Sequence, residues 1–208
     1  MLSRKEEGAA NGTVNRGVAL LRSAYNFAVR DGVIDEVYMP HFEFFDEREA
    51  VRTGFLTEGD LVKVTDELPE HYKDLLWFGF YFCWRLSEII NLEWREVSMT
   101  QRRITLSPTK VKNREIRILP IEAEIADIIG RRMGKRVESC PYVFHRDGTK
   151  HYVKLWKPFK RAFRAAGYPN NTFHDLRRSG IRRLVLAGIP QAIIMKISGH
   201  KTDEVFRR

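Results

Sequence analysis

The 208-residue chain is long enough for one or two domains with a sizeable core, and its 43% hydrophobic and 12% aromatic content is typical of a globular protein. It has neither an apolar run of about 18 residues nor a hydrophobic N-terminal segment, which argues against a membrane-spanning protein and against secretion through a signal peptide. Two cysteines, Cys83 and Cys140, favour a reduced cytoplasmic setting over a disulfide framework.

The positive charge of the chain is concentrated in its last part. The formal charge is +9, yet residues 150–208 contain 14 Lys or Arg against three acidic residues, and the first 149 residues carry a net −2. Such a segment favours a polyanionic partner such as nucleic acid, through phosphate neutralisation and counterion release. A solvated basic surface is the alternative interpretation.

The first half of the chain predicts an N-terminal helical piece, a linker and a second region. Residues 1–12 are polar and predict no regular element, and Thr13 is a plausible N-cap of a helix that ends at Asp31-Gly32. Residues 39–52 have the composition of a linker. The segment Thr57-Glu58-Gly59-Asp60 predicts a capping box that opens the second region.

The middle of the chain predicts buried helices and a small sheet. Residues 72–83 are apolar on nearly every face, which suits a fully buried helix, and a short helix follows over 86–92. Residues 104–106 and 116–119 alternate like strands, with 112–114 at the hairpin tip. Pro120 is expected to open a helix through Ile129.

The last third of the chain predicts mainly helices. Residues 141–144 suit a short extended piece, and 153–166 a helix that Gly167 ends. Thr172 is expected to cap a helix to Ala187, and helices at 190–196 and after Thr202 follow. The fold class is therefore mainly α (α+β), with a small antiparallel sheet in the middle.

Four groups of polar residues carry the chemistry. Arg85 is followed by Glu88; Lys110 and Lys112 lie at the predicted hairpin; His174 is followed by Arg177; and His200 follows Ser198-Gly199. Arginine forks match phosphate oxygens and stabilise charge at a pentacovalent phosphorus, while Lys or His can transfer a proton to a leaving oxygen. The sequence has no Asp/Glu cluster with metal spacing, so we expect neither a two-metal nuclease nor a cofactor.

Each group alone has an ordinary structural interpretation. Arg85 can pair with Glu88 three residues on, the two lysines suit a strand edge, and His200 can cap a helix. The arginines of the basic helix can form one solvated face: Arg177, Arg178, Arg182 and Arg183.

In combination and order, these groups resemble the active site of the tyrosine recombinase (phage integrase) family across roughly residues 50–208. The closest motifs are His174-Asp175-Leu176-Arg177-Arg178 and the segment from Ser198 to Phe206. The resemblance implies a helical catalytic domain over 49–208 with a small three-stranded antiparallel sheet. Residues 1–48 would be the C-terminal part of a helical core-binding domain plus linker. Cys83-Trp84 stands where Thr-Gly-x is common, which leaves the local turn open.

The resemblance also implies roles for the site residues. Arg85 and Arg177 would clamp the scissile phosphate, and Glu88 would orient Arg85. His174 would act as acid and base, and His200 would hold the phosphate or position the nucleophile.

The family also has a lysine that protonates the departing 5′-oxygen. Lys112 lies eight residues before Pro120, which is the family spacing, and Lys110 is the alternative. Further arginines on the basic helix would contact DNA: Arg178, Arg182 and Arg183.

In the family, the nucleophilic tyrosine lies nine positions after the histidine that corresponds to His200. That position is 209, one past Arg208, so the 208 residues are expected to bind double-stranded DNA without cutting it. The full-length protein would act as a tetramer on DNA, away from membranes, in the cytoplasm and on the nucleoid. Two alternatives stay open: a non-enzymatic DNA-binding relative, and a helix-turn-helix regulator using 173–187, which leaves Arg85 and Glu88 unexplained.

Overall fold

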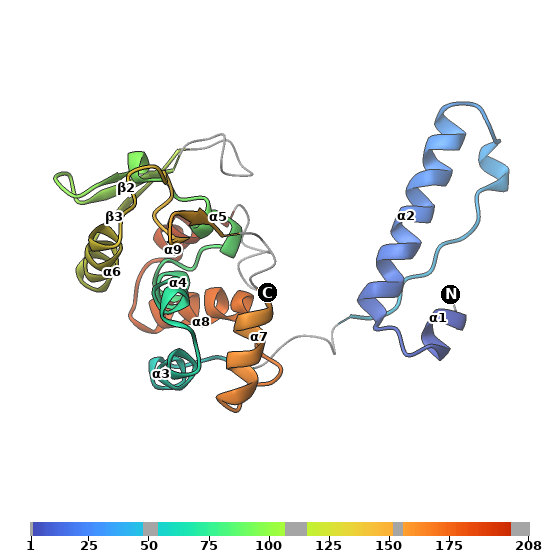
Figure 1. The fold of residues 1–208 in the computed structure, drawn as a ribbon. Coiled ribbons are helices and arrows are strands. Elements are labelled where there is room, and N and C mark those ends of the chain that lie inside the picture. The colour runs from blue at the N-terminus through green and yellow to red at the C-terminus, as the bar shows by residue number, and fades with distance from the viewer. Residues whose placement is uncertain (1, 48–53, 107–115, 152–155, 201–208) are drawn as a thin grey trace. The chain divides into compact units, whose positions relative to one another are not determined.

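The structure is a computed structural model that describes residues 2–47, 54–106, 116–151 and 156–200. The chain divides into two compact units, Met1–Thr53 and Gly54–Arg208, and each is described by itself (Figure 1). Thr202 and its predicted helix lie outside the described residues, as do Lys110 and Lys112.

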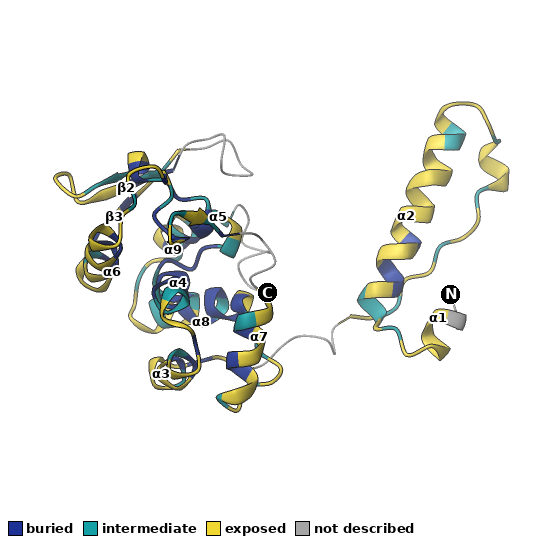
Figure 2. Cartoon of the chain, in the orientation of Figure 1, coloured by how far each residue is buried: buried dark blue, intermediate teal, exposed yellow. Residues whose placement is uncertain are grey.

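The first unit consists of α1 (Leu2–Glu6), α2 (Asn11–Arg30) and the short 3-10 helix η1 (Glu36–Tyr38). The prediction of an irregular start was wrong, because α1 lies within residues 1–12. The predicted Thr13 cap was also wrong, because α2 begins at Asn11 with Ala10 as N-cap. The Asn15 amide donates to the Phe45 carbonyl and accepts from the Phe45 amide, so the returning segment lies along α2. Most of α2 is nevertheless exposed (Figure 2).

The second unit is mainly helical with a small antiparallel sheet, which confirms the predicted fold class. The sheet has the order β1-β2-β3, and its central register pairs Ile104 with Leu119 and Leu106 with Arg117. Its strands are β1 (Val97–Ser98), β2 (Arg103–Leu106) and β3 (Arg117–Pro120). The helices are α3 (Glu58–Asp66), α4 (Glu70–Phe82), α5 (Leu86–Ile90), η3 (Trp94–Glu96), α6 (Ala123–Gly134), α7 (Trp156–Ala165), α8 (Phe173–Leu186) and α9 (Gln191–Ser198).

The starts of two helices were predicted correctly from their capping residues. Thr57 and Asp60 form a capping box at α3, and Thr172 and Asp175 form another at α8. The helix predicted to start at Pro120 was wrong, because Pro120 ends β3 and α6 begins at Ala123. The extended piece at 141–144 contributes only a bridge from Tyr142 to Glu93. A second hairpin, β4 (His145–Arg146) with β5 (Thr149–Lys150), was not predicted.

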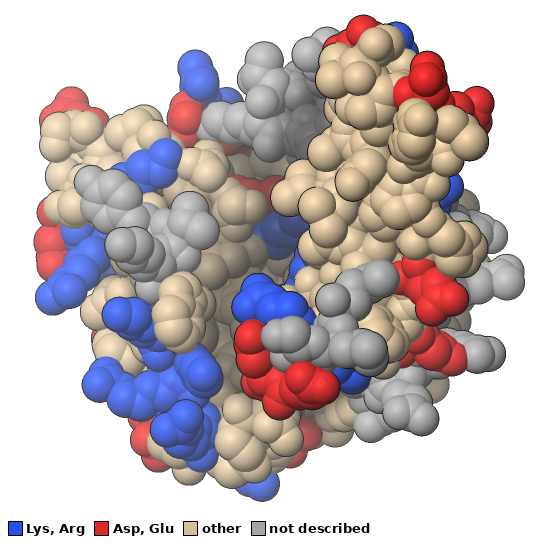
Figure 3. All heavy atoms as spheres, turned by 90° about the vertical axis from the view of Figure 1, so that its right-hand side faces the viewer, with Lys and Arg blue, Asp and Glu red and all other residues tan. Residues whose placement is uncertain are grey.

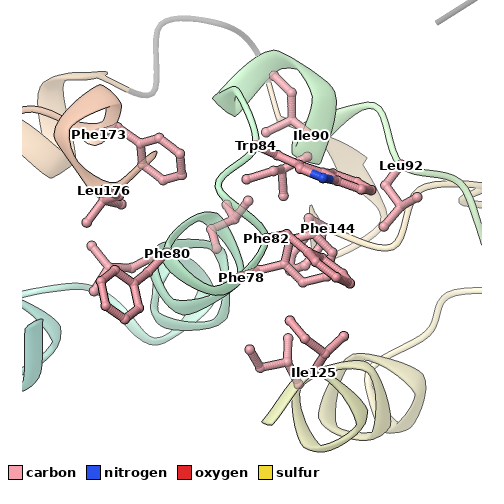
Figure 4. Close-up of a cluster of buried hydrophobic side chains, with 14 of the residues drawn as sticks. Phe78, Phe80, Phe82, Trp84, Ile90, Leu92, Ile125, Phe144, Phe173 and Leu176 are labelled. Carbon is pink, nitrogen blue, oxygen red and sulfur yellow. The ribbon is translucent and has the colours of Figure 1, made fainter. Parts of the chain in front are cut away.

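Helix α4 runs through the centre of the core of the second unit. Its buried aromatic side chains meet Trp84 and Phe144 in edge and stacked contacts (Figure 4). The prediction of a buried helix is thus confirmed for most of its length, although Trp77 and Tyr81 are partly exposed.

Helices α4 and α8 approach each other closely, and a glycine permits the contact. A Cβ added to Gly180 would lie 2.0 Å from the Phe80 carbonyl oxygen and 2.7 Å from the Cys83 sulfur. Because α8 also carries Arg177, this contact places Arg177 beside the end of α4, where it donates to the Cys83 carbonyl.

Candidate active site

Four of the predicted catalytic residues line one open cavity of about 590 Å³. Arg85 comes from the start of α5, His174 and Arg177 come from α8, and His200 follows α9. One wall is apolar and continues along α8. The remaining lining residues are Phe55, Arg178, Ile181, Arg182, Val185 and Leu186.

A left-handed turn at Cys83 directs the chain from α4 to Arg85. Cys83 has φ 56° and ψ 31°, a conformation in which glycine is the unstrained residue, and its side chain is fully buried. Burial raises the pKa of the Cys83 thiol to about 12.

Arg85 is the N-cap of α5 and is held by Glu88. The Glu88 carboxylate accepts from the Arg85 backbone amide at 3.2 Å and from its guanidinium at 3.1 Å. Arg85 keeps 42% of its side chain exposed toward the cavity, whereas Glu88 keeps 9%. The guanidinium is thus oriented by a buried carboxylate and remains open to an anion.

Arg177 is buried, and its partners are all neutral groups. Its Nη1 donates to the carbonyls of Cys83 at 2.8 Å and Ser198 at 2.5 Å, which ties the end of α4 to the end of α9. Burial, together with the nearby Arg85 charge, lowers the pKa of Arg177 to about 10, so it stays positive at neutral pH. A buried cation held by neutral groups favours an incoming anion.

His200 completes the same network. Nη2 of Arg177 lies 2.9 Å from Nε2 of His200, and Ser198 Oγ lies 2.8 Å from its Nδ1. Burial, together with the charges of Arg177 and Arg85, lowers the pKa of His200 to about 4, so the ring is neutral at pH 7.

His174 lies at the exposed rim of the cavity. Partial desolvation lowers its pKa, and the positive charge of Arg177 lowers it further, so the neutral form is favoured. A neutral imidazole open to solvent can accept a proton from a nucleophile, which is the chemistry expected of an acid and base in this position.

The other predicted DNA-binding arginines separate into two sets. Arg178 and Arg182 line the cavity and lie over the Phe55 ring, 5.2 and 5.0 Å from its centroid. Arg183 instead lies over the rings of Phe80 and Tyr81 and is not among the cavity residues. Lys and Arg side chains also gather at the lower left of the face drawn in Figure 3.

Two residues beside the site were missed by sequence reasoning. Phe55 gave no signal, because it lies in a segment without periodicity. The backbone amide of the next residue, Leu56, donates to Ser179 Oγ and so holds this segment against α8. Arg117 was hidden by its strand pattern, because the apolar Ile118 is 60% exposed whereas the Arg117 side chain is only 10% exposed.

Two kinds of feature are absent from the described ranges. No helix there has the length and apolar character needed to cross a membrane. No three His, Cys, Asp or Glu side chains of those ranges are grouped as metal ligands.

The chain is similar to known recombinases in sequence and in fold. It is 27% identical over 168 residues to the integrase of Salmonella phage P22, covering 76% of this chain and 43% of that protein. It is 23% identical over 217 residues to tyrosine recombinase XerD of Lacticaseibacillus casei, covering 96% and 72%. A lambda integrase tetramer bound to a Holliday junction has the same fold, with a TM-score of 0.78 at 16% identity, covering 97% of this chain and 59% of that one.

The family model named Phage integrase family matches residues 55–208, which is the whole second unit except its first residue. The chain spans about half the length of the curated phage and prophage integrases it matches. Since the family model covers well over half of the chain, this protein belongs to the phage integrase family of tyrosine recombinases.

Proposed function

We propose that the second unit is the phosphate-activating part of a site-specific DNA recombinase that cuts and rejoins DNA through a 3′-phosphotyrosine. The convergence of Arg85, Arg177, His174 and His200 on one cavity supports this best. Two guanidinium groups would hold the non-bridging oxygens of one phosphodiester and stabilise the charge of its pentacovalent state. The first unit would be the end of a core-binding domain.

The proton transfers are assigned to a histidine and a lysine. His174 would take the proton of the attacking tyrosine, and Lys112, or else Lys110, would protonate the departing 5′-oxygen. His200 would help to hold the phosphate or to position the nucleophile. The bond energy would be kept in the phosphotyrosine link, so that rejoining needs no external energy source.

The 208 residues are proposed to bind duplex DNA, and the nucleophilic tyrosine is expected at position 209, nine after His200. In the full-length protein, a tyrosine there would complete the site, and four protomers would act on two duplexes at the nucleoid. The DNA-bound tetramer known for lambda integrase motivates this assembly.

Fluorescence anisotropy with a labelled duplex tests the binding part of the proposal. Arg85→Ala is expected to weaken binding by about tenfold and to reduce the salt slope by about one. Arg146→Ala is the control, because Arg146 is 65% exposed on the β4–β5 hairpin and is not a cavity residue. Equal binding by the parent, Arg85→Ala and Arg177→Lys would refute the phosphate clamp.

A further inference from the structure

Arg117 has an environment that strand alternation does not predict. It begins β3, the strand that follows the segment carrying Lys110 and Lys112. Its side chain keeps only 10% of its surface exposed. Burying a guanidinium is costly unless its charge and donors are matched, so the groups around it indicate what it does.

One side of Arg117 faces the support of Arg85. Its Nη2 lies 3.2 Å from Oε2 of Glu88, whose other oxygen accepts from Arg85 at 3.1 Å. Glu88 is therefore shared between two arginines, one open to the cavity and one behind it. The charge of Arg117 beside Oε2 adds an ion pair to the two hydrogen bonds, from the Arg85 amide and guanidinium, that hold this carboxylate toward Arg85.

The other side of Arg117 faces the turn that presents His200. Its Nη1 donates toward the Ile197 carbonyl at 3.5 Å, and the same carbonyl accepts from Trp84 Nε1 at 3.0 Å. Its guanidinium carbon lies 5.2 Å from the Trp84 ring centroid. A Cβ on Gly199 would lie 2.3 Å from Nη1 and would displace the guanidinium, and the φ of 73° at Gly199 is a conformation that favours glycine.

We propose that Arg117 is a positioning residue that fixes Arg85 through Glu88 and His200 through the backbone of the Ile197–Gly199 turn. It does not line the cavity, so it acts on the phosphate only through those two residues. The strand β3 thereby sets the separation of the two halves of the site. This inference rests on the proposed function, because it takes the separation of Arg85 and His200 to be the one that suits a bound phosphodiester.

The test compares Arg117→Met with Arg103→Met. Arg103 is an exposed residue of β2 that pairs with Pro120 at the other end of β3, so its variant removes the same charge from the same sheet. Two quantities are measured: the pKa of His200 by NMR of the ring, assigned with His200→Gln, and the affinity for a labelled DNA duplex. The first needs no DNA and does not depend on the proposed function.

For Arg117→Met, the pKa of His200 is expected to rise from about 4 toward its ordinary value of 6.5, because a loosened turn exposes the ring. DNA binding is expected to weaken by about tenfold, with Arg103→Met changing it by less than about twofold. An unchanged His200 pKa in Arg117→Met overturns the inference, whatever the loss of thermal stability.

Two further variants keep the result interpretable. If Arg117→Met does not fold, Arg117→Lys replaces it; lysine keeps one charge near Glu88 but has no second branch for the turn, so an intermediate His200 pKa is expected. If the His200 pKa and the DNA affinity of Arg117→Lys both equal those of the parent protein, the inference is overturned. If Arg85→Ala binds DNA like the parent, the proposed function fails, even where the His200 result stands.

Discussion

Nη2 of Arg177 lies 2.9 Å from Nε2 of His200 and 3.2 Å from its Nδ1, and the shorter approach joins a buried cation to a neutral imidazole. Arginine has donors only, and Nε2 must therefore accept. The proton of the neutral ring is then on Nδ1, where Ser198 Oγ accepts it at 2.8 Å, and the Ser198 hydroxyl donates to the Ile194 carbonyl at 2.7 Å. The free site thus holds His200 as the Nδ1–H tautomer.

The first prediction concerns this tautomer. Nitrogen-15 NMR at pH 7 is expected to show a protonated Nδ1 and an unprotonated Nε2 in His200, with protonation only near pH 4. In Arg177→Met, the pKa of His200 should rise, because a neighbouring positive charge is lost. A His200 that is protonated at pH 6.5, or that carries its proton on Nε2, contradicts the assigned network.

A second prediction separates two adjacent arginines. Arg182→Ala is expected to weaken DNA binding about threefold to tenfold and to lower the salt slope by about one, because Arg182 lines the cavity. Arg183→Ala is expected to change DNA binding less and to lower the melting temperature more, because Arg183 packs over Phe80 and Tyr81. Anisotropy titrations and thermal melts measure both. Equal losses of binding would show that the whole basic helix faces DNA.

A third prediction concerns the contact of α4 with α8. Gly180→Ala is expected to lower the free energy of unfolding by about 2–4 kcal/mol, because the added Cβ would overlap the Phe80 carbonyl. Gly130→Ala is the matched control, since Gly130 is an exposed glycine of α6 with nothing within 4 Å of an added Cβ. That variant should gain about 0.5–1 kcal/mol. Urea denaturation measures the free energy of unfolding of both variants. Similar values for the two would contradict the close approach of α4 and α8.

A fourth prediction concerns acid stability. His151 is buried beside His71, with ring centroids 6.1 Å apart, and burial lowers the pKa of His151 to about 4. The charges of His71, Arg132, His145 and Arg146 are the smaller causes of this lowered pKa. As pH falls below 6.5, the unfolded chain takes up the proton first, so stability present above pH 6.5 is lost progressively toward pH 4. His151 should account for about 1–3 kcal/mol of this loss.

The free energy of unfolding from urea denaturation between pH 7 and 5 measures the effect before most carboxylates titrate. His151→Gln is expected to flatten the pH slope, and His41→Gln, at an exposed position, is the control. If the free energy of unfolding of His151→Gln depends on pH as steeply as that of the parent protein, His151 is not desolvated in the folded state.

The predictable parts of the fold were those decided locally. The apolar run of α4 and the Thr-x-x-Asp capping boxes of α3 and α8 need only neighbouring residues to form. The start of α6 was misplaced, because Pro120 is tolerated at the end of β3 as well as at the start of a helix. The two-residue strands β4 and β5 are too short for alternation to be read from the sequence.

The same distinction applies to the site. Arg85, His174, Arg177 and His200 were found by their order and spacing, and the structure brings all four to one cavity. The division between Arg182 and Arg183 was not predictable, because it depends on how α8 packs against α4. Arg117 was hidden because its strand turns an arginine inward and an isoleucine outward, which only the partners Glu88 and Trp84 explain.

The most direct test of the central claim uses the full-length protein that contains these 208 residues, with a nicked duplex that loses a short strand on cleavage. A covalent protein–DNA adduct is expected, joined through a tyrosine nine positions after His200, and Arg177→Lys should reduce its rate by at least about a hundredfold. Adduct formation should need no added metal. Duplex binding with no adduct at any time would contradict the account and would identify the protein as a non-enzymatic DNA-binding relative.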